Sequence, residues 1–215
     1  RDRLRLGMRI LIREGSAARN LATLIKGVDA YTAKRCSFCT DDKQPEDILA
    51  EGHIDFNVRL AIENGLDPVT AIQLATINGA EAYGLSGKGS ITPGFDADLV
   101  VVDNLRRFKV EQVYKRGELV AENLEAKFSV VAPDISRVSG SVKTSQIKLK
   151  DFTLTLKGDL AHVIHLHSGS LITEKAVRKV FVDQNGCFVP QKKLDICKLA
   201  VIERHKGSGN IGLGL

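Results

Sequence analysis

The sequence has 215 residues, of which 43% are hydrophobic and 27% charged, and its formal net charge is +5. This composition fits one large or two modest globular domains, and no apolar run approaches the roughly 18 residues that a bilayer span needs. Basic residues are interleaved with Asp and Glu, and aromatic residues make up only 5% of the chain. We therefore expect a cytoplasmic protein without a nucleic-acid or membrane partner.

Both ends of the sequence suggest a truncated polypeptide. The chain starts at Arg1 rather than at a methionine, and it stops within an apolar, glycine-rich segment. We expect further sequence at each end.

The first 85 residues predict alternating strands and helices. Strands are expected at 8–12 and 35–39, and helices at 17–26, 46–51, 54–64 and 68–83. The last helix has Asp67 as its N-cap and Pro68 at its first position. Such βα units belong to doubly wound sheets or to barrels, where active sites gather at the carboxyl ends of the strands.

Beyond residue 85 the pattern indicates β-structure. A strand at 97–102 precedes a hairpin, 110–115 and 118–121, which Arg116-Gly117 joins as a tight turn. After about residue 125 a second α+β domain is expected, with strands near 152–157, 162–167, 179–182 and 198–204. The predicted domains are therefore 1–85, 86–124 and 125–215.

Charged residues follow both early strands, as REGS at 13–16 and TDDK at 40–43. These side chains could form an active site at the strand ends. They could equally cap the helices that follow, because a carboxylate before a helix accepts backbone N–H bonds and favours the helix dipole. The residues alone support both interpretations.

Residues 89–102, GSITPGFDADLVVV, resemble the motif G-x-I-x-P-G-x-D-A-D-L-V-V, by which amidohydrolases return from a barrel to a small β-sandwich. We expect Asp96 and Asp98 to bond the backbone of this turn. Four further segments are similar to adenine deaminases of that superfamily in order and spacing: REGSAARN at 13–20, FCTDDK at 38–43, EGHID at 51–55 and ERHKGSGNIGLG at 203–214. Together these segments are distributed over nearly the whole chain, from residue 13 to residue 214.

The resemblance implies an α/β fold in three parts. Residues 1–85 would be the last two βα units of a (β/α)8, TIM-like barrel, and residues 86–124 strands of the β-sandwich. Residues 125–215 would start the α+β C-terminal domain that is particular to adenine deaminases. Relatives of this kind also imply a homo-oligomer, most simply a dimer.

The activity implied is hydrolysis of adenine to hypoxanthine and ammonia in purine salvage. Amidohydrolases activate water with a divalent metal, here manganese or iron with zinc as a third candidate, in a binuclear site. The resemblance makes Asp41 both a metal ligand and the general base. Asp42 is the alternative, and it could instead orient the ligand or cap a helix.

The other ligands that the resemblance implies, an H-x-H pair, a bridging acidic residue and later histidines, would precede Arg1. One carboxylate does not make a metal site. We expect the chain alone to be inactive and, with open strand edges, to aggregate or associate. The alternatives are another amidohydrolase, acting on cyclic amides or N-acetyl sugars, and a non-catalytic fragment or binding module.

Three more residues are candidates for contacting substrate or for orienting the groups that do. Glu14 and Ser16 follow the first strand, and His53 follows the Asp41 segment closely. For Ser16 the competing interpretation is an N-cap of the helix from residue 17. His53 could be an ordinary polar residue at a helix start.

Two other patterns allow a metal interpretation that we do not favour. Cys36 and Cys39 form a C-x-x-C without a second pair at ligand spacing, so reduced thiols are expected. His165 and His167 lie on one side of a predicted strand, but His162 lies on the other and no acidic or cysteine partner is near in sequence.

Overall fold

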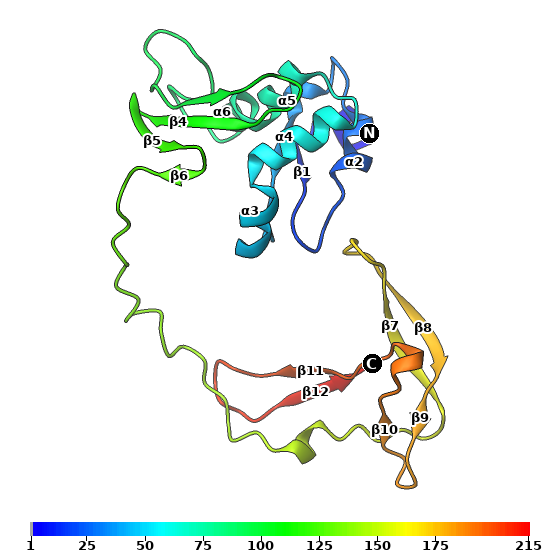
Figure 1. Ribbon diagram of the computed structural model, residues 1–215. Coiled ribbons are helices and arrows are strands. Elements are labelled where there is room, and N and C mark those ends of the chain that lie inside the picture. Colours follow the sequence, from blue (N-terminus) through cyan, green and yellow to red (C-terminus); the bar gives the residue numbers. More distant parts are fainter. Residues whose placement is uncertain (1) are drawn as a thin grey trace. The chain divides into compact units, whose positions relative to one another are not determined.

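The computed structural model describes residues 2–215 and divides into two compact units (Figure 1). The first holds the chain up to Val130 together with Ser168–Leu171. The second holds Val131–His167 and Ile172–Leu215. Within residues 2–215, no helix combines the length and the apolar content needed to cross a bilayer.

A parallel strand pair forms the centre of the first unit. Strands β1 (Ile10–Arg13) and β2 (Cys36–Cys39) pair so that Ile12 lies beside Phe38. Because side chains alternate along a strand, Ile12 and Phe38 point into the core, whereas Leu11 is 48% exposed on the opposite face. This second face becomes one wall of the pocket described below.

The first unit also contains short helices and 3₁₀ turns. They are α1 (Asp2–Arg5), α2 (Leu21–Leu24), the 3₁₀ turns Ile25–Gly27 and Ala33–Arg35, α3 (Pro45–Glu51), α4 (Ile54–Glu63), α5 (Pro68–Ala75) and α6 (Ile77–Ala82). Side chains from the two strands, from α2, α4 and α5 and from the two 3₁₀ turns form one core, made of Ile12, Leu21, Ile25, Cys36, Phe38, Val58, Ala61, Ala71 and Leu74 with Ala33. Each larger side chain buried there contributes about 1.5–3 kcal/mol. The mixed α/β order expected from the sequence is confirmed.

The helix predicted at 17–26 is largely wrong. Only Leu21–Leu24 is α-helical, and Ile25–Gly27 is a 3₁₀ turn. Residues 14 and 19 instead form an antiparallel bridge, and the Gly15 N–H donates to Ala18 O at 3.0 Å. Backbone N–H and C=O groups of residues 14–19, which a longer helix would have bonded internally, make these contacts instead.

The helix predicted at 68–83 is present but broken at Thr76, which has φ −130° and ψ −95°. Asp67 caps it as expected, accepting the Thr70 N–H at 2.9 Å. The break lets the Asn78 side chain donate to Ala33 O and Cys36 O, each at 2.9 Å. These bonds tie α6 to the 3₁₀ turn Ala33–Arg35 and to the first residue of β2.

The first unit also contains an antiparallel sheet, in the order β3 (Leu99–Val102), β4 (Val110–Lys115), β5 (Glu118–Glu122) and β6 (Glu125–Ala126). Arg116 and Gly117 join β4 to β5 with φ of +51° and +83°. Two successive positive φ values define the type I′ turn that suits the twist of a hairpin. The predicted tight turn is confirmed.

The expected role of Asp96 is wrong, and that of Asp98 needs changing. Asp96 pairs with the Lys88 side chain at 2.6 Å rather than with the backbone of the Pro-Gly turn. Asp98 accepts the backbone N–H of Arg116 at 3.0 Å and pairs with Lys88 and Lys115. Asp98 therefore joins the turn to the β4–β5 hairpin, whereas Asp96 joins it to Lys88.

The second unit is built from β-hairpins. Its strands are β7 (Leu160–Leu166) with β8 (Thr173–Lys179), β9 (Phe181–Val182) with β10 (Phe188–Val189), and β11 (Leu199–Ile202) with β12 (Ile211–Gly214). Two 3₁₀ turns, Leu149–Phe152 and Lys192–Leu194, complete it. The strand expected at 152–157 is wrong, because only Thr155 forms a β-bridge there, to Cys187.

Candidate active site

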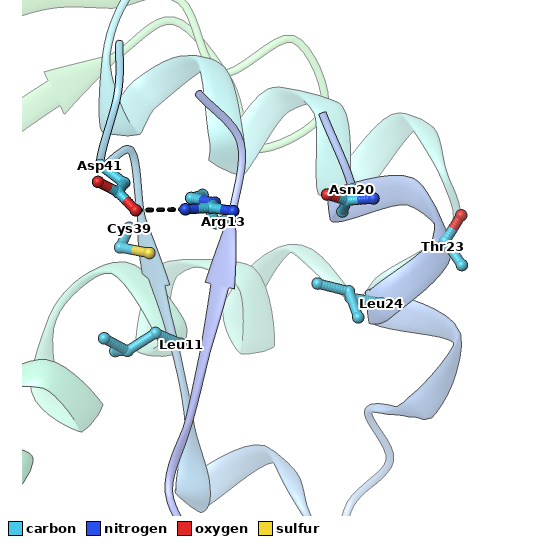
Figure 2. A pocket seen from close by; sticks show the side chains of 7 residues that line it. All are labelled: Leu11, Arg13, Asn20, Thr23, Leu24, Cys39 and Asp41. Atoms are coloured by element: carbon cyan, nitrogen blue, oxygen red, sulfur yellow. Dashed lines mark hydrogen bonds and ion pairs between the residues drawn. The ribbon is translucent and has the colours of Figure 1, made fainter. Parts of the chain in front are cut away.

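An open pocket of about 390 Å³ lies against the exposed face of the β1–β2 pair (Figure 2). Strand residues Leu11, Arg13 and Cys39 form one wall, and Asn20, Thr23 and Leu24 come from α2 and its cap. Asp41, the predicted catalytic residue, completes the lining. The carboxyl ends of the two strands thus lie at this pocket, as expected for a βα unit.

Asp41 directs its carboxylate toward the guanidinium of Arg13, and the two side chains form an ion pair (Figure 2). The Asp41 side chain is 59% exposed, so this pair is open to solvent and to ligands. Its backbone has φ +52°, in the left-handed region that residues other than glycine rarely adopt. Tertiary contacts of its neighbours must hold that conformation.

Asp42 and Ser16 connect the two strand-end segments instead of lining the pocket. One Asp42 carboxylate oxygen accepts the Ala17 N–H at 2.8 Å, and this bond lowers the pKa of Asp42 below its usual range. Ser16 accepts the Gln44 N–H at 2.8 Å through its hydroxyl. Ser16 is therefore not the N-cap of its own helix, which starts later, at Leu21.

Glu14 is buried, and its carboxylate accepts the N–H of Leu21 at 3.0 Å. It thereby takes the capping role that the side chain of Asn20, the N-cap residue of α2, does not fill. His53 precedes α4, and its Nε2 lies 3.0 Å from the hydroxyl of Thr40. Neither Glu14 nor His53 lines the pocket.

Lys43 and Glu51 form an ion pair that sequence reasoning missed. The Lys43 side chain is 1% exposed and its ammonium lies 4.4 Å from the centre of the Phe56 ring. Glu51 also pairs with Arg19 at 3.0 Å, and hydrogen bonds from Lys43 and Arg19 lower the pKa of Glu51. The only sequence signal was a lysine directly after two aspartates.

The sequence profile of the Amidohydrolase family matches residues 6–120, which is more than half of the chain. The chain belongs to the amidohydrolase family. The matched residues include β1, β2 and the pocket, so the candidate site lies within the part of the chain that carries the family pattern.

Similar proteins agree with this membership. The chain is 46% identical over its whole length to an adenine deaminase of Nitratidesulfovibrio vulgaris and 45% identical to one of Clostridium acetobutylicum. It spans 37% and 38% of the lengths of these two relatives. In structure it resembles a β-aspartyl dipeptidase from Fervidobacterium islandicum, with a TM-score of 0.50, 21% identity, and 61% of this chain and 36% of that chain covered.

Amidohydrolases are generally metal-dependent, and a metal at this site would need several donor side chains close together. Within residues 2–215, no three His, Cys, Asp or Glu side chains converge as metal ligands do. Asp41 is the one carboxylate in the pocket lining, and Arg13 already pairs with it. Because a catalytic metal needs several ligands in a preset geometry, the described residues do not by themselves fit one.

The histidines and cysteines considered in the sequence likewise belong to no group of three metal donors within residues 2–215. Cys36 points into the core and Cys39 into the pocket, and both are free thiols whose pKa burial raises. On β7, His165 packs edge-to-face against His167, and His167 lies 3.3 Å from Glu174.

Proposed function

We propose that the chain forms part of an adenine deaminase that hydrolyses adenine to hypoxanthine and ammonia in purine salvage. The observation that carries this proposal is the position of Asp41. Its carboxylate lies at the end of β2, in an open pocket, within a chain that is similar over its entire length to adenine deaminases. A carboxylate so placed can accept a proton from water and return it to the departing ammonia.

Asp41 would also be one ligand of a divalent metal, with manganese, iron or zinc as candidates and a binuclear site in the intact enzyme. When bound, such a metal lowers the pKa of water. The other candidate residues would act indirectly, through hydrogen bonds to backbone groups and to a hydroxyl near the site. These residues are Asp42, Glu14, Ser16 and His53. Their bonds to Ala17, Leu21, Gln44 and Thr40 support that role.

For the whole polypeptide we propose a TIM-like (β/α)8 barrel to which residues 1–85 contribute two βα units. Residues 86–124 would belong to a β-sandwich, and residues 125–215 would start the C-terminal domain. The parallel pairing of β1 with β2 and the antiparallel sheet that follows support this division. A cytoplasmic protein without nucleic-acid or membrane partners fits the composition, and the resemblance to adenine deaminases implies a dimer.

The test uses the polypeptide extended to the length of its relatives, with adenine as substrate, added manganese or iron, and ammonia release as the measurement. We expect Asp41→Ala to reduce kcat by at least about 10³-fold, because the proposed base and a metal ligand are removed together. Asp42→Ala should leave a larger residual rate. Glu46→Gln, an exposed change on α3, is the matched control.

Two results would change the proposal. If the extended protein releases no ammonia from adenine but hydrolyses a cyclic amide or an N-acetyl sugar, the family stands and the substrate is wrong. If Asp42→Ala is the more damaging variant, Asp42 takes the role proposed for Asp41.

A further inference from the structure

Residues 40–44, here called the Asp41 segment, each make a side-chain or backbone contact within the first unit, and the contact of Asp41 itself is its ion pair with Arg13. Thr40 contacts His53 at 3.0 Å, Asp42 accepts from Ala17 at 2.8 Å, and the Gln44 N–H donates to Ser16 at 2.8 Å. Lys43 pairs with Glu51. Asp41 alone points into the pocket, with a left-handed backbone that its neighbours must hold in place.

Lys43 is the most unusual of these anchors because its charge is buried. An ammonium removed from water is stable only if it is paired, and Lys43 has both the Glu51 carboxylate and the face of the Phe56 ring. Lys43 does not line the pocket. Its charge therefore acts on the protein rather than on a ligand.

Glu51 links Lys43 to the other strand-end segment. One carboxylate oxygen pairs with Lys43, and the other lies 3.0 Å from the guanidinium of Arg19, which follows β1. The backbone carbonyl of Glu51 accepts from Arg59 on α4. A single side chain at the end of α3 thus joins the segments that follow β1 and β2.

We propose that Lys43 and Glu51 are positioning residues that set the place of the Asp41 carboxylate in the pocket. The inference rests on the proposed deaminase activity, and it adds two residues that act through Asp41 without touching substrate. A misplacement of about 1 Å at a reacting group can cost about 10²-fold in rate. Loss of the ion pair should therefore reduce kcat more than it changes KM.

The experiment compares Glu51→Gln and Lys43→Met in the polypeptide extended to the length of its relatives. Both variants should lower kcat for adenine deamination by about 10- to 100-fold and change KM by less than about threefold. Lys43→Arg, which keeps the charge, should recover part of the lost rate. Amide hydrogen exchange in the peptide covering the Asp41 segment should be faster in Glu51→Gln than in the unchanged protein.

Two controls separate positioning from stability. Glu46→Gln changes an exposed carboxylate on the same helix and should leave both kcat and exchange unchanged. Ala71→Gly removes a buried methyl group from α5 and should lower Tm without slowing the folded enzyme.

Unchanged kcat in Glu51→Gln and Lys43→Met would overturn the inference. So would an equal loss of kcat in Ala71→Gly at the same loss of Tm, because the rate would then follow stability alone. If the unchanged protein does not deaminate adenine, the proposed function fails on its own. Hydrogen exchange then decides the inference: faster exchange of the Asp41 segment in Glu51→Gln supports it, and unchanged exchange refutes it.

Discussion

At the scale of single residues, Gly15 allows the two strand-end segments to touch. A Cβ at this position would lie 1.7 Å from a carboxylate oxygen of Asp42 and 2.8 Å from the carbonyl oxygen of Thr40. No side chain fits at such distances. The missing side chain is what lets Asp42 reach the Ala17 N–H, a bond that ties the segment carrying Asp41 to the end of β1.

We expect Gly15→Ala to separate these segments and to lower the free energy of unfolding by about 1–3 kcal/mol, the usual cost of overpacking. It should also lower kcat of the extended enzyme, because the Asp41 segment moves. Thermal and urea unfolding, with the ammonia assay, measure both effects. Gly79→Ala on α6 is the matched control, since a methyl group added there would meet nothing within 4 Å. Equal effects of the two substitutions would contradict this role of Gly15.

At the scale of elements, Glu203 organises the loop between β11 and β12. Its carboxylate accepts the backbone N–H groups of His205 at 2.6 Å, Lys206 at 2.9 Å and Ser208 at 3.0 Å. These bonds lower the pKa of Glu203 to about 2. The motif that resembled adenine deaminases at 203–214 therefore has a structural role in this hairpin.

The stability that Glu203 gives to the hairpin should depend on pH. Because its folded pKa of about 2 lies below its ordinary value of 4.5, the contribution is complete above pH 4.5 and is lost as the pH falls toward 2. We expect the protection of the Ser208 amide against hydrogen exchange to fall over this range. Glu203→Gln should exchange faster at pH 6 and lose most of the pH dependence. Identical profiles for the two proteins would refute the assignment.

At the scale of the whole molecule, the strand pair of the first unit is open. Within residues 2–215, β1 and β2 pair only with each other, so each keeps an unpaired edge. Leu11 on β1 and Leu24 on α2 are 48% and 42% exposed. The chain spans 37% of the length of its adenine deaminase relative from Nitratidesulfovibrio vulgaris. Open edges and exposed apolar side chains favour association.

We expect the 215-residue chain alone to self-associate, and the extended polypeptide to form one defined species. Size-exclusion chromatography with light scattering compares them. Leu11→Lys should reduce association of the short chain, because it places a charge on the open face. Tyr31→Lys changes a side chain that is 95% exposed outside the pocket lining and serves as control. A monomeric short chain at micromolar concentration would show that these edges do not drive association.

The amino-acid sequence by itself determined the features that depend on neighbouring residues. Asp67 and Pro68 begin a helix, and Arg116-Gly117 turns a hairpin, because a cap bond or a pair of positive φ values involves only a few adjacent positions. The order of strands and helices around the pocket was also predictable from the sequence pattern. That pattern placed Asp41 at a strand end, where the structure has it.

Only the tertiary structure decided which groups those side chains meet. Ser16 bonds Gln44, 28 positions away, and Asn78 reaches Ala33 and Cys36 across 45 and 42 positions. The contact of Gly15 with Asp42 likewise needs β1 and β2 to lie side by side. The Lys43–Glu51 pair needs α3 to fold back onto the segment that follows β2. Such partners are set by strand register and helix packing, which bring together residues that no local sequence pattern connects.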